Sequence, residues 1–187
     1  MIKKQLIIFA VLSILTGSFV SESFLILPAI SSEPDTFATS VTAKQPEKTV
    51  IHLYFSNKEN SFLIAEKRVL VQPDDPAQLG KLIVESLIKG PAKEGLMRTI
   101  SSDATLRALF VTEDKTAYAD FSPVIREKHP GGCKSEIITI YSIVNSLILN
   151  ISEIDTVKIL IDGRESMTLA GHIDLRFPLK ADMLLVR

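Results

Sequence analysis

The stretch from Ser135 to Gly163 constrains this chain most, because it predicts a buried helix followed by a buried strand. Apolar residues recur there at spacings of three and four, which places them on one face of an α-helix. They are Ile137, Ile140, Tyr141, Val144, Leu147 and Ile148. Residues 156–161 are mostly β-branched and end at Asp162-Gly163, a pair typical of a tight turn. The stretch therefore predicts a helix packed on a strand.

Two pairs of strands are predicted before this helix. Residues 50–55 and 62–71 are rich in apolar side chains and are separated by polar turn residues, which predicts a hairpin. Residues 105–112 and 115–121 predict a second hairpin. In its first strand the alternation places Leu106, Ala108 and Phe110 on one face.

A first helix is predicted between the two hairpins. Asp75 is the expected N-cap, Pro76 occupies the first helical position, and Gln78 completes a capping box. Gly90 and Pro91 then end the helix. Its buried stripe is predicted to comprise Leu79, Leu82, Ile83 and Leu87.

The order strand, strand, helix, strand, strand, helix, strand predicts a mixed α+β fold. We expect one mixed sheet with both helices packed on one face. The 187 residues allow one domain of ordinary size, placed at 49–187, and an attachment before it.

The N-terminus carries the pattern of an export signal. The basic start Met1-Ile2-Lys3-Lys4 precedes an apolar run from Leu6 to Val20, and apolar residues resume at 24–28. The run is short for a spanning helix, which needs about 20 residues. We favour an uncleaved signal-anchor over 1–30, with a cleaved signal peptide and a buried helix of the domain as the alternatives.

Residues 31–48 are polar, contain proline and lack periodicity, so they predict a flexible spacer. No cysteine lies near the end of the apolar run, which excludes a lipoprotein anchor within this sequence. With a signal peptide or an anchor, the lysines at 3 and 4 stay in the cytoplasm and the domain is exported.

Charge and cysteine content exclude several classes of function. The formal net charge is −1 and the cations are scattered, whereas a nucleic-acid-binding surface gathers them on one face. The single cysteine excludes an internal disulfide and a multi-cysteine metal site. We therefore expect no nucleic-acid partner.

Cys133 is the sharpest candidate for catalysis. It directly precedes the second helix, whose dipole would favour a thiolate, and His129 is near enough in sequence to act as a base. No third orienting group is visible, so an incidental small residue at a helix start is the preferred interpretation.

Other polar residues are better explained by structure than by chemistry. His172, Asp174, Asp162 and Glu165 cluster in sequence, but their spacing fits no usual set of metal ligands. Asp120, at a strand end, is interpreted as a cap because no partner carboxylate for acid–base catalysis is identifiable. We therefore expect no metal, no cofactor and no catalytic residues.

One surface of the second helix is a candidate for binding a partner. Ser142, Asn145 and Ser146 lie on its polar side. Small uncharged polar residues suit either a solvated face or a helix surface docked on a partner, and the sequence leaves both interpretations open.

Several motifs in fixed order resemble the GerMN domain family of sporulation and spore germination. They are Leu53-Tyr54-Phe55, the helix end at 87–91, Tyr118-Ala119-Asp120-Phe121-Ser122, the helix at 141–147, the strand from Val157 to Gly163, and Gly171-His172-Ile173-Asp174. The resemblance covers about Val50 to Leu184. Two departures are the Ile100-Ser101 pair, where the family often has Ile-Pro, and the absence of a lipid-anchor cysteine.

The resemblance implies an exported interaction module with an α/β fold similar to ring-building modules, and no enzymatic activity. We expect a membrane-tethered domain outside the cytoplasmic membrane that binds envelope or cell-wall proteins, or copies of itself. The alternatives are a sensor for peptidoglycan fragments or small molecules, and an enzyme that uses Cys133.

Overall fold

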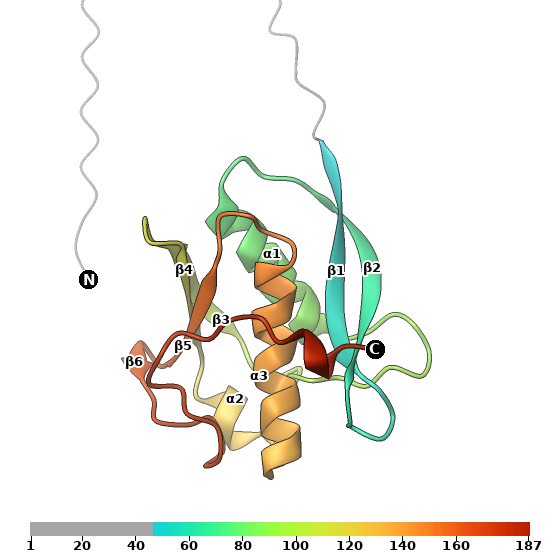
Figure 1. Ribbon diagram of the computed structural model, residues 1–187, viewed down its shortest axis with the longest axis vertical. Coiled ribbons are helices and arrows are strands. Elements are labelled where there is room, and N and C mark those ends of the chain that lie inside the picture. The colour runs from blue at the N-terminus through green and yellow to red at the C-terminus, as the bar shows by residue number, and fades with distance from the viewer. Residues whose placement is uncertain (1–46) are drawn as a thin grey trace, which may run out of the picture. The chain divides into compact units, whose positions relative to one another are not determined.

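The computed structural model describes residues 47–187 (Figure 1). The predicted membrane segment 1–30 and nearly all of the predicted spacer lie outside the described residues. Among the described residues, no helix is long and apolar enough to cross a membrane. The elements are β1 (Lys48–Ser56), β2 (Leu63–Val71), α1 (Pro76–Lys89), β3 (Leu106–Val111), β4 (Thr116–Phe121), α2 (Val124–Glu127), α3 (Cys133–Ile148), β5 (Thr156–Ile161), β6 (Arg164–Glu165) and the 3₁₀ helix η1 (Met183–Leu185).

The strands form two separate sheets, so the prediction of a single mixed sheet is wrong. β1 and β2 form an antiparallel hairpin, and the second sheet has the order β3-β4-β5-β6. In that sheet β4 and β5 run parallel, and the other neighbours are antiparallel. Figure 1 shows the hairpin on one side of α3 and the four-stranded sheet on the other. The predicted α+β class and the order of the main elements are confirmed.

The hairpin stays separate because α3 covers the edge of β1 that faces away from β2. Asn150, just beyond α3, binds both backbone groups of His52: its Oδ1 accepts from the N–H and its Nδ2 donates to the carbonyl, each at 2.8 Å. Two serines of α3 bind the backbone of Tyr54 in the same way. These side chains form hydrogen bonds with the backbone N–H and carbonyl groups of β1 that another strand would need for pairing.

Helix α3 is enclosed on most of its circumference, where the sequence predicted one apolar face. Ten of its 16 residues are buried, and it packs against β1, β5 and α1. α1 packs in turn on β3 and β1. The two helices therefore lie between two sheets, not on one face of a single sheet. A helix buried on nearly all sides contributes to a core shared by both sheets.

The predicted first and last residues of α1 are confirmed, but within residues 47–187 Gln78 forms no hydrogen bond that would complete the predicted capping box. The Asp75 side chain accepts from the backbone N–H of Ala77 at 3.0 Å, and Pro76 opens the helix. Gly90 ends it with a φ of 92°, a region that favours glycine. A Cβ added at Gly80 would lie 2.9 Å from Cδ2 of Leu109, so this glycine lets α1 approach β3 closely.

The predicted alternation in β3 fails after its first residue. A β-bulge shifts the register between Leu106 and Ala108. As a result Leu109, not Ala108, faces the core with Leu106, while Phe110 is exposed and stacks on Tyr118 with ring centroids 5.0 Å apart. An inserted residue reverses the faces of all that follow, and nothing in the alternation reveals it.

Candidate functional site

The candidate partner-binding face of α3 is buried inside the domain. Ser142, Asn145 and Ser146 each have an exposed fraction of 0%. Ser142 Oγ donates to the carbonyl of Tyr54 at 2.6 Å, and Ser146 Oγ accepts from the Tyr54 N–H at 3.0 Å. These side chains therefore form neither a solvated face nor a face open to another protein, because β1 packs on the two serines.

Asn145 binds the C-terminal segment instead. Its Nδ2 donates to the carbonyl of Asp182 and its Oδ1 accepts from the Asp182 N–H, each at 2.9 Å. The polar strip of α3 is therefore covered by β1 and the C-terminal segment of its own domain, and it is not exposed to a partner protein.

The structure does not bring Cys133 and His129 together. Cys133 is an exposed free thiol in the first turn of α3. His129 Nδ1 accepts from the Gly131 N–H at 3.0 Å, and its Nε2 lies 3.2 Å from Thr139 Oγ1. Both ring nitrogens therefore have partners other than the thiol. Burial lowers the pKa of His129, so its imidazole is neutral at pH 7.

The four residues considered as metal ligands have separate roles, and His172 lies against Glu136, with its Nδ1 2.9 Å from Oε2. Asp162 pairs with Arg107, Glu165 lies 3.4 Å from the buried Lys158 ammonium, and Arg176 binds Asp174 and holds the pKa of that carboxyl at about 2. Across residues 47–187, no group of three or more His, Cys, Asp or Glu side chains is placed to hold a metal ion.

Asp120 acts as the sequence indicated, as a cap. Its Oδ1 accepts from the N–H of Gly163 at 2.8 Å and thereby fixes the turn between β5 and β6. In this turn Asp162 and Gly163 have φ values of 55° and 72°, as the Asp-Gly pair predicted.

Sequence reasoning missed Glu136, a carboxylate with an exposed fraction of 0% in the first turn of α3. Its Oε1 accepts from the backbone N–H groups of Leu169 and Ala170 at 3.0 and 2.8 Å. Its Oε2 accepts from the N–H of His172 at 2.8 Å and lies 2.9 Å from His172 Nδ1. Glu136 therefore holds the loop that carries Gly171-His172. In the sequence it precedes the buried Ile140 by four residues, which places both on the same helical face.

Glu66 on β2 is a second buried carboxylate that the sequence did not reveal. It accepts from the backbone N–H groups of Ala92 and Lys93 at 3.0 and 2.8 Å and pairs with Arg68. Arg68 Nη2 in turn donates to the carbonyl of Gly90 at 3.0 Å. Both charged residues thus fix the chain where it leaves α1.

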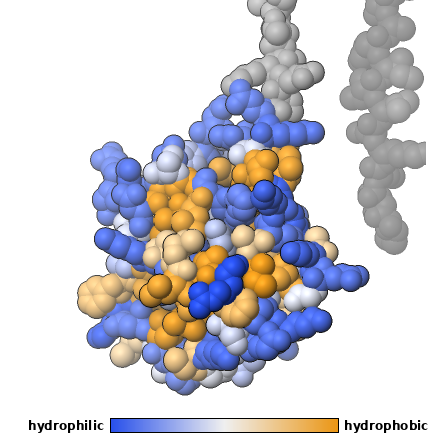
Figure 2. Space-filling model, turned by 45° about the vertical axis from the view of Figure 1, so that its right-hand side comes forward, coloured by the Kyte–Doolittle hydropathy of each residue, from blue (hydrophilic) through white to orange (hydrophobic). Residues whose placement is uncertain are grey.

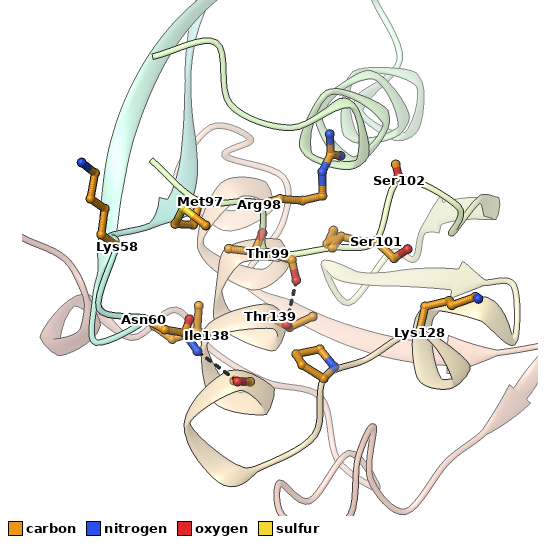
Figure 3. A pocket seen from close by; sticks show the side chains of 13 residues that line it. Lys58, Asn60, Met97, Arg98, Thr99, Ser101, Ser102, Lys128, Ile138 and Thr139 are labelled. Carbon is orange, nitrogen blue, oxygen red and sulfur yellow. Dashed lines mark hydrogen bonds between the residues drawn. The ribbon is translucent and has the colours of Figure 1, made fainter. Parts of the chain in front are cut away.

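A pocket of about 370 Å³ opens between the loop after α1 and the N-terminal half of α3 (Figure 3). Lys58 and Lys128 flank it in the view, with Asn60, Thr99 and Thr139 between them. The remaining lining residues are Met97, Arg98, Ile100, Ser101, Ser102, Pro130, Ser135 and Ile138. The site has cations and hydroxyls but no arranged nucleophile and base.

The fold and this site define a compact α+β domain whose buried polar side chains serve mainly to position loops. Residues 52–166, more than half of the chain, match the Germane family, described as "Sporulation and spore germination". The chain belongs to this family, which confirms the resemblance to GerMN domains.

Solved structures show the same fold. The first GerMN domain of the sporulation protein GerM from Bacillus subtilis is 23% identical, with a TM-score of 0.56, 72% of this chain covered and 96% of that one. The tandem GerMN domains of the same protein are 22% identical, with a TM-score of 0.56, 73% of this chain covered and 46% of that one. A putative lipoprotein from Clostridium perfringens is 20% identical, with a TM-score of 0.51 and coverages of 71% and 87%. Among curated proteins, no relative matches the chain.

Proposed function

We propose that this protein is a non-catalytic interaction module of the cell envelope, tethered outside the cytoplasmic membrane by its N-terminal segment. Its partners are envelope or cell-wall-associated proteins, or further copies of itself. The observation that carries the proposal is how the polar groups are used: Ser142, Asn145 and Glu136 bind backbone groups of the same domain instead of converging on a cleft.

The names of similar structures support an envelope location. One is described as a lipoprotein, and two as domains of a sporulation protein. Figure 2 shows apolar residues in several patches among charged ones on the face that it presents. Exposed apolar side chains such as Val69, Phe110 and Phe177 are available for contact with a partner.

The proposal is tested by site-specific crosslinking of the full chain in intact cells. A photoreactive residue is placed in turn at Val69 of β2, Phe110 of β3 and Phe177 after β6, three exposed side chains from different segments. We expect a discrete adduct from one position, either with an envelope protein or with a differently tagged copy of the chain. Equal, diffuse labelling from all three positions, or none, would contradict an interaction module.

Cys133→Ser separates this proposal from the thiol enzyme. The thiol is exposed, and both ring nitrogens of His129 have other partners, so we expect the substitution to leave both the crosslink and the cellular role unchanged. Loss of the cellular role with the crosslink retained would favour an enzyme.

A further inference from the structure

The pocket beside α3 is lined by cations and by no acidic side chain. Lys58, Arg98 and Lys128 contribute to its wall, and its other lining residues are uncharged. Asp and Glu make up 22 residues of the chain, about as many as Lys and Arg, so this local imbalance does not reflect the overall composition. A concave site lined by one sign of charge concentrates ligands of the opposite sign.

The two lysines keep their charges available. Within the described chain neither Lys58 nor Lys128 has a carboxylate within 4 Å, and both side chains are exposed. Four acids are next to lining residues in sequence. Glu59 accepts from Asn57, Asp103 accepts from Ser102 at 3.5 Å, and Glu136 accepts from the loop at 169–172, whereas Glu127 is exposed. Arg98 differs, because its guanidinium donates to the carbonyls of Ile88 and Lys89 at the end of α1.

The polar groups between the lysines can donate hydrogen bonds. Ser135 Oγ accepts from Asn60 Nδ2 at 3.0 Å, and Ser101 Oγ accepts from the N–H of Asp103 at 3.3 Å. In these bonds each serine acts as the acceptor, so its hydroxyl hydrogen is left to donate to a ligand oxygen. Ser135 also belongs to the first turn of α3, whose positive end adds to the field.

We propose that this pocket binds a small anionic ligand through a carboxylate or phosphate group. Lys58 and Lys128 attract the charge from either end, Ser101 and Ser135 donate to its oxygens, and Met97 and Ile138 contact an apolar part of the ligand. The volume of about 370 Å³ lies in the range of small-molecule sites. This binding activity is separate from the proposed protein contacts.

The test is a titration of the full chain in non-ionic detergent, followed by the backbone amide signals in ¹⁵N NMR spectra. Inorganic phosphate and succinate are the two probes, and they distinguish the phosphate from the carboxylate form of the ligand. We expect saturable shifts of the amides of residues 97–102 and of Ser135 with at least one probe, weakened by added salt.

The double variant Lys58→Gln/Lys128→Gln should reduce the affinity about five-fold, as expected for two exposed charge pairs. Lys89→Gln/Lys180→Gln is the matched control, because both lysines are exposed and lie outside the pocket while the net charge changes equally. Shifts spread over the surface, an absence of shifts with both probes, or an equal loss in the control would overturn the proposal.

Discussion

At the scale of single residues, two buried carboxylates fix the positions of irregular loops. Glu66 and Glu136 each accept backbone N–H groups from a loop that has no regular secondary structure. A carboxylate offers several acceptor sites on two oxygens, so one side chain can satisfy several donors in such a loop.

Glu136→Gln should destabilise the domain strongly. The amide keeps one acceptor oxygen but turns an NH₂ group toward donors, which leaves buried groups of the loop at 169–172 unsatisfied. We expect a loss of about 2–4 kcal/mol in the free energy of unfolding, measured by urea denaturation. Glu94→Gln, at an exposed position, is the control and should change the midpoint little. Equal midpoints for the two variants would contradict the role of Glu136.

The same carboxylates predict a loss of stability in acid. Burial raises the pKa of Glu136, but the hydrogen bonds from Ala170 and His172 lower it by more than burial raises it. The pKa therefore lies below the ordinary value of 4.5. For Glu66 burial is likewise outweighed, by Lys93 and Arg68, and the pKa is also lowered. Below about pH 4.5 the unfolded chain therefore binds more protons than the folded domain, and stability falls as the pH falls.

Urea denaturation between pH 7 and pH 3 measures this effect. The free energy of unfolding should be nearly constant above about pH 5.5, which is about one unit above the ordinary carboxyl pKa. Below about pH 5.5 it should decrease. Glu136→Gln should show a shallower decrease, because one of the carboxylates with a lowered pKa is gone. A variant curve parallel to that of the wild type would exclude Glu136 as a contributor.

At the scale of elements, local signals predicted what local chemistry decides. Asp75, Pro76 and Gly90 fix the ends of α1, and Asp162-Gly163 fixes the turn after β5. The bulge in β3 could not be predicted, since its cause lies in the pairing with β4. The two-sheet arrangement also escaped prediction, because it depends on side chains of α3 that replace a neighbouring strand.

Asn150→Ala tests whether this replacement supports the hairpin. The substitution removes both bonds to His52 and the bond from Nδ2 to the carbonyl of Ser146 at 2.7 Å. We expect a loss of about 1–3 kcal/mol in the free energy of unfolding and faster hydrogen exchange at the amide of His52. Ser152→Ala, an exposed neighbour, is the control. Unchanged exchange at His52 would mean that β1 does not need this partner.

At the scale of the whole molecule, the candidate site shows where sequence reasoning ends. For the polar strip of Ser142, Asn145 and Ser146 the sequence left a solvated face and a partner-binding face open. The strip is instead buried against segments that are distant in sequence, about 90 residues upstream for Ser142 and Ser146 and at Asp182 for Asn145. The pocket likewise joins Lys58, Lys128 and Ser135 from distant segments, a juxtaposition that no local pattern encodes.

The C-terminal segment joins the hairpin to the rest of the domain, which leads to a last prediction. Leu185 and Val186 pack on the cluster of Tyr54, Leu63 and Ile138, and the Arg187 N–H donates to the carbonyl of Leu63 at 2.9 Å. Removal of residues 182–187 exposes this cluster and leaves the buried Asn145 amide without its partner.

We expect the truncated chain to lose about 3 kcal/mol or more in the free energy of unfolding, because several apolar side chains lose their cover and one amide its hydrogen bonds. Asn145→Ala should reproduce only the polar part of this loss, and Leu184→Ala, at a side chain with an exposed fraction of 85%, should reproduce almost none of it. Urea denaturation of the three variants separates these contributions. If truncation costs no more than Leu184→Ala, the segment does not hold the hairpin, and contacts of β1 with α3 alone fix the hairpin in place.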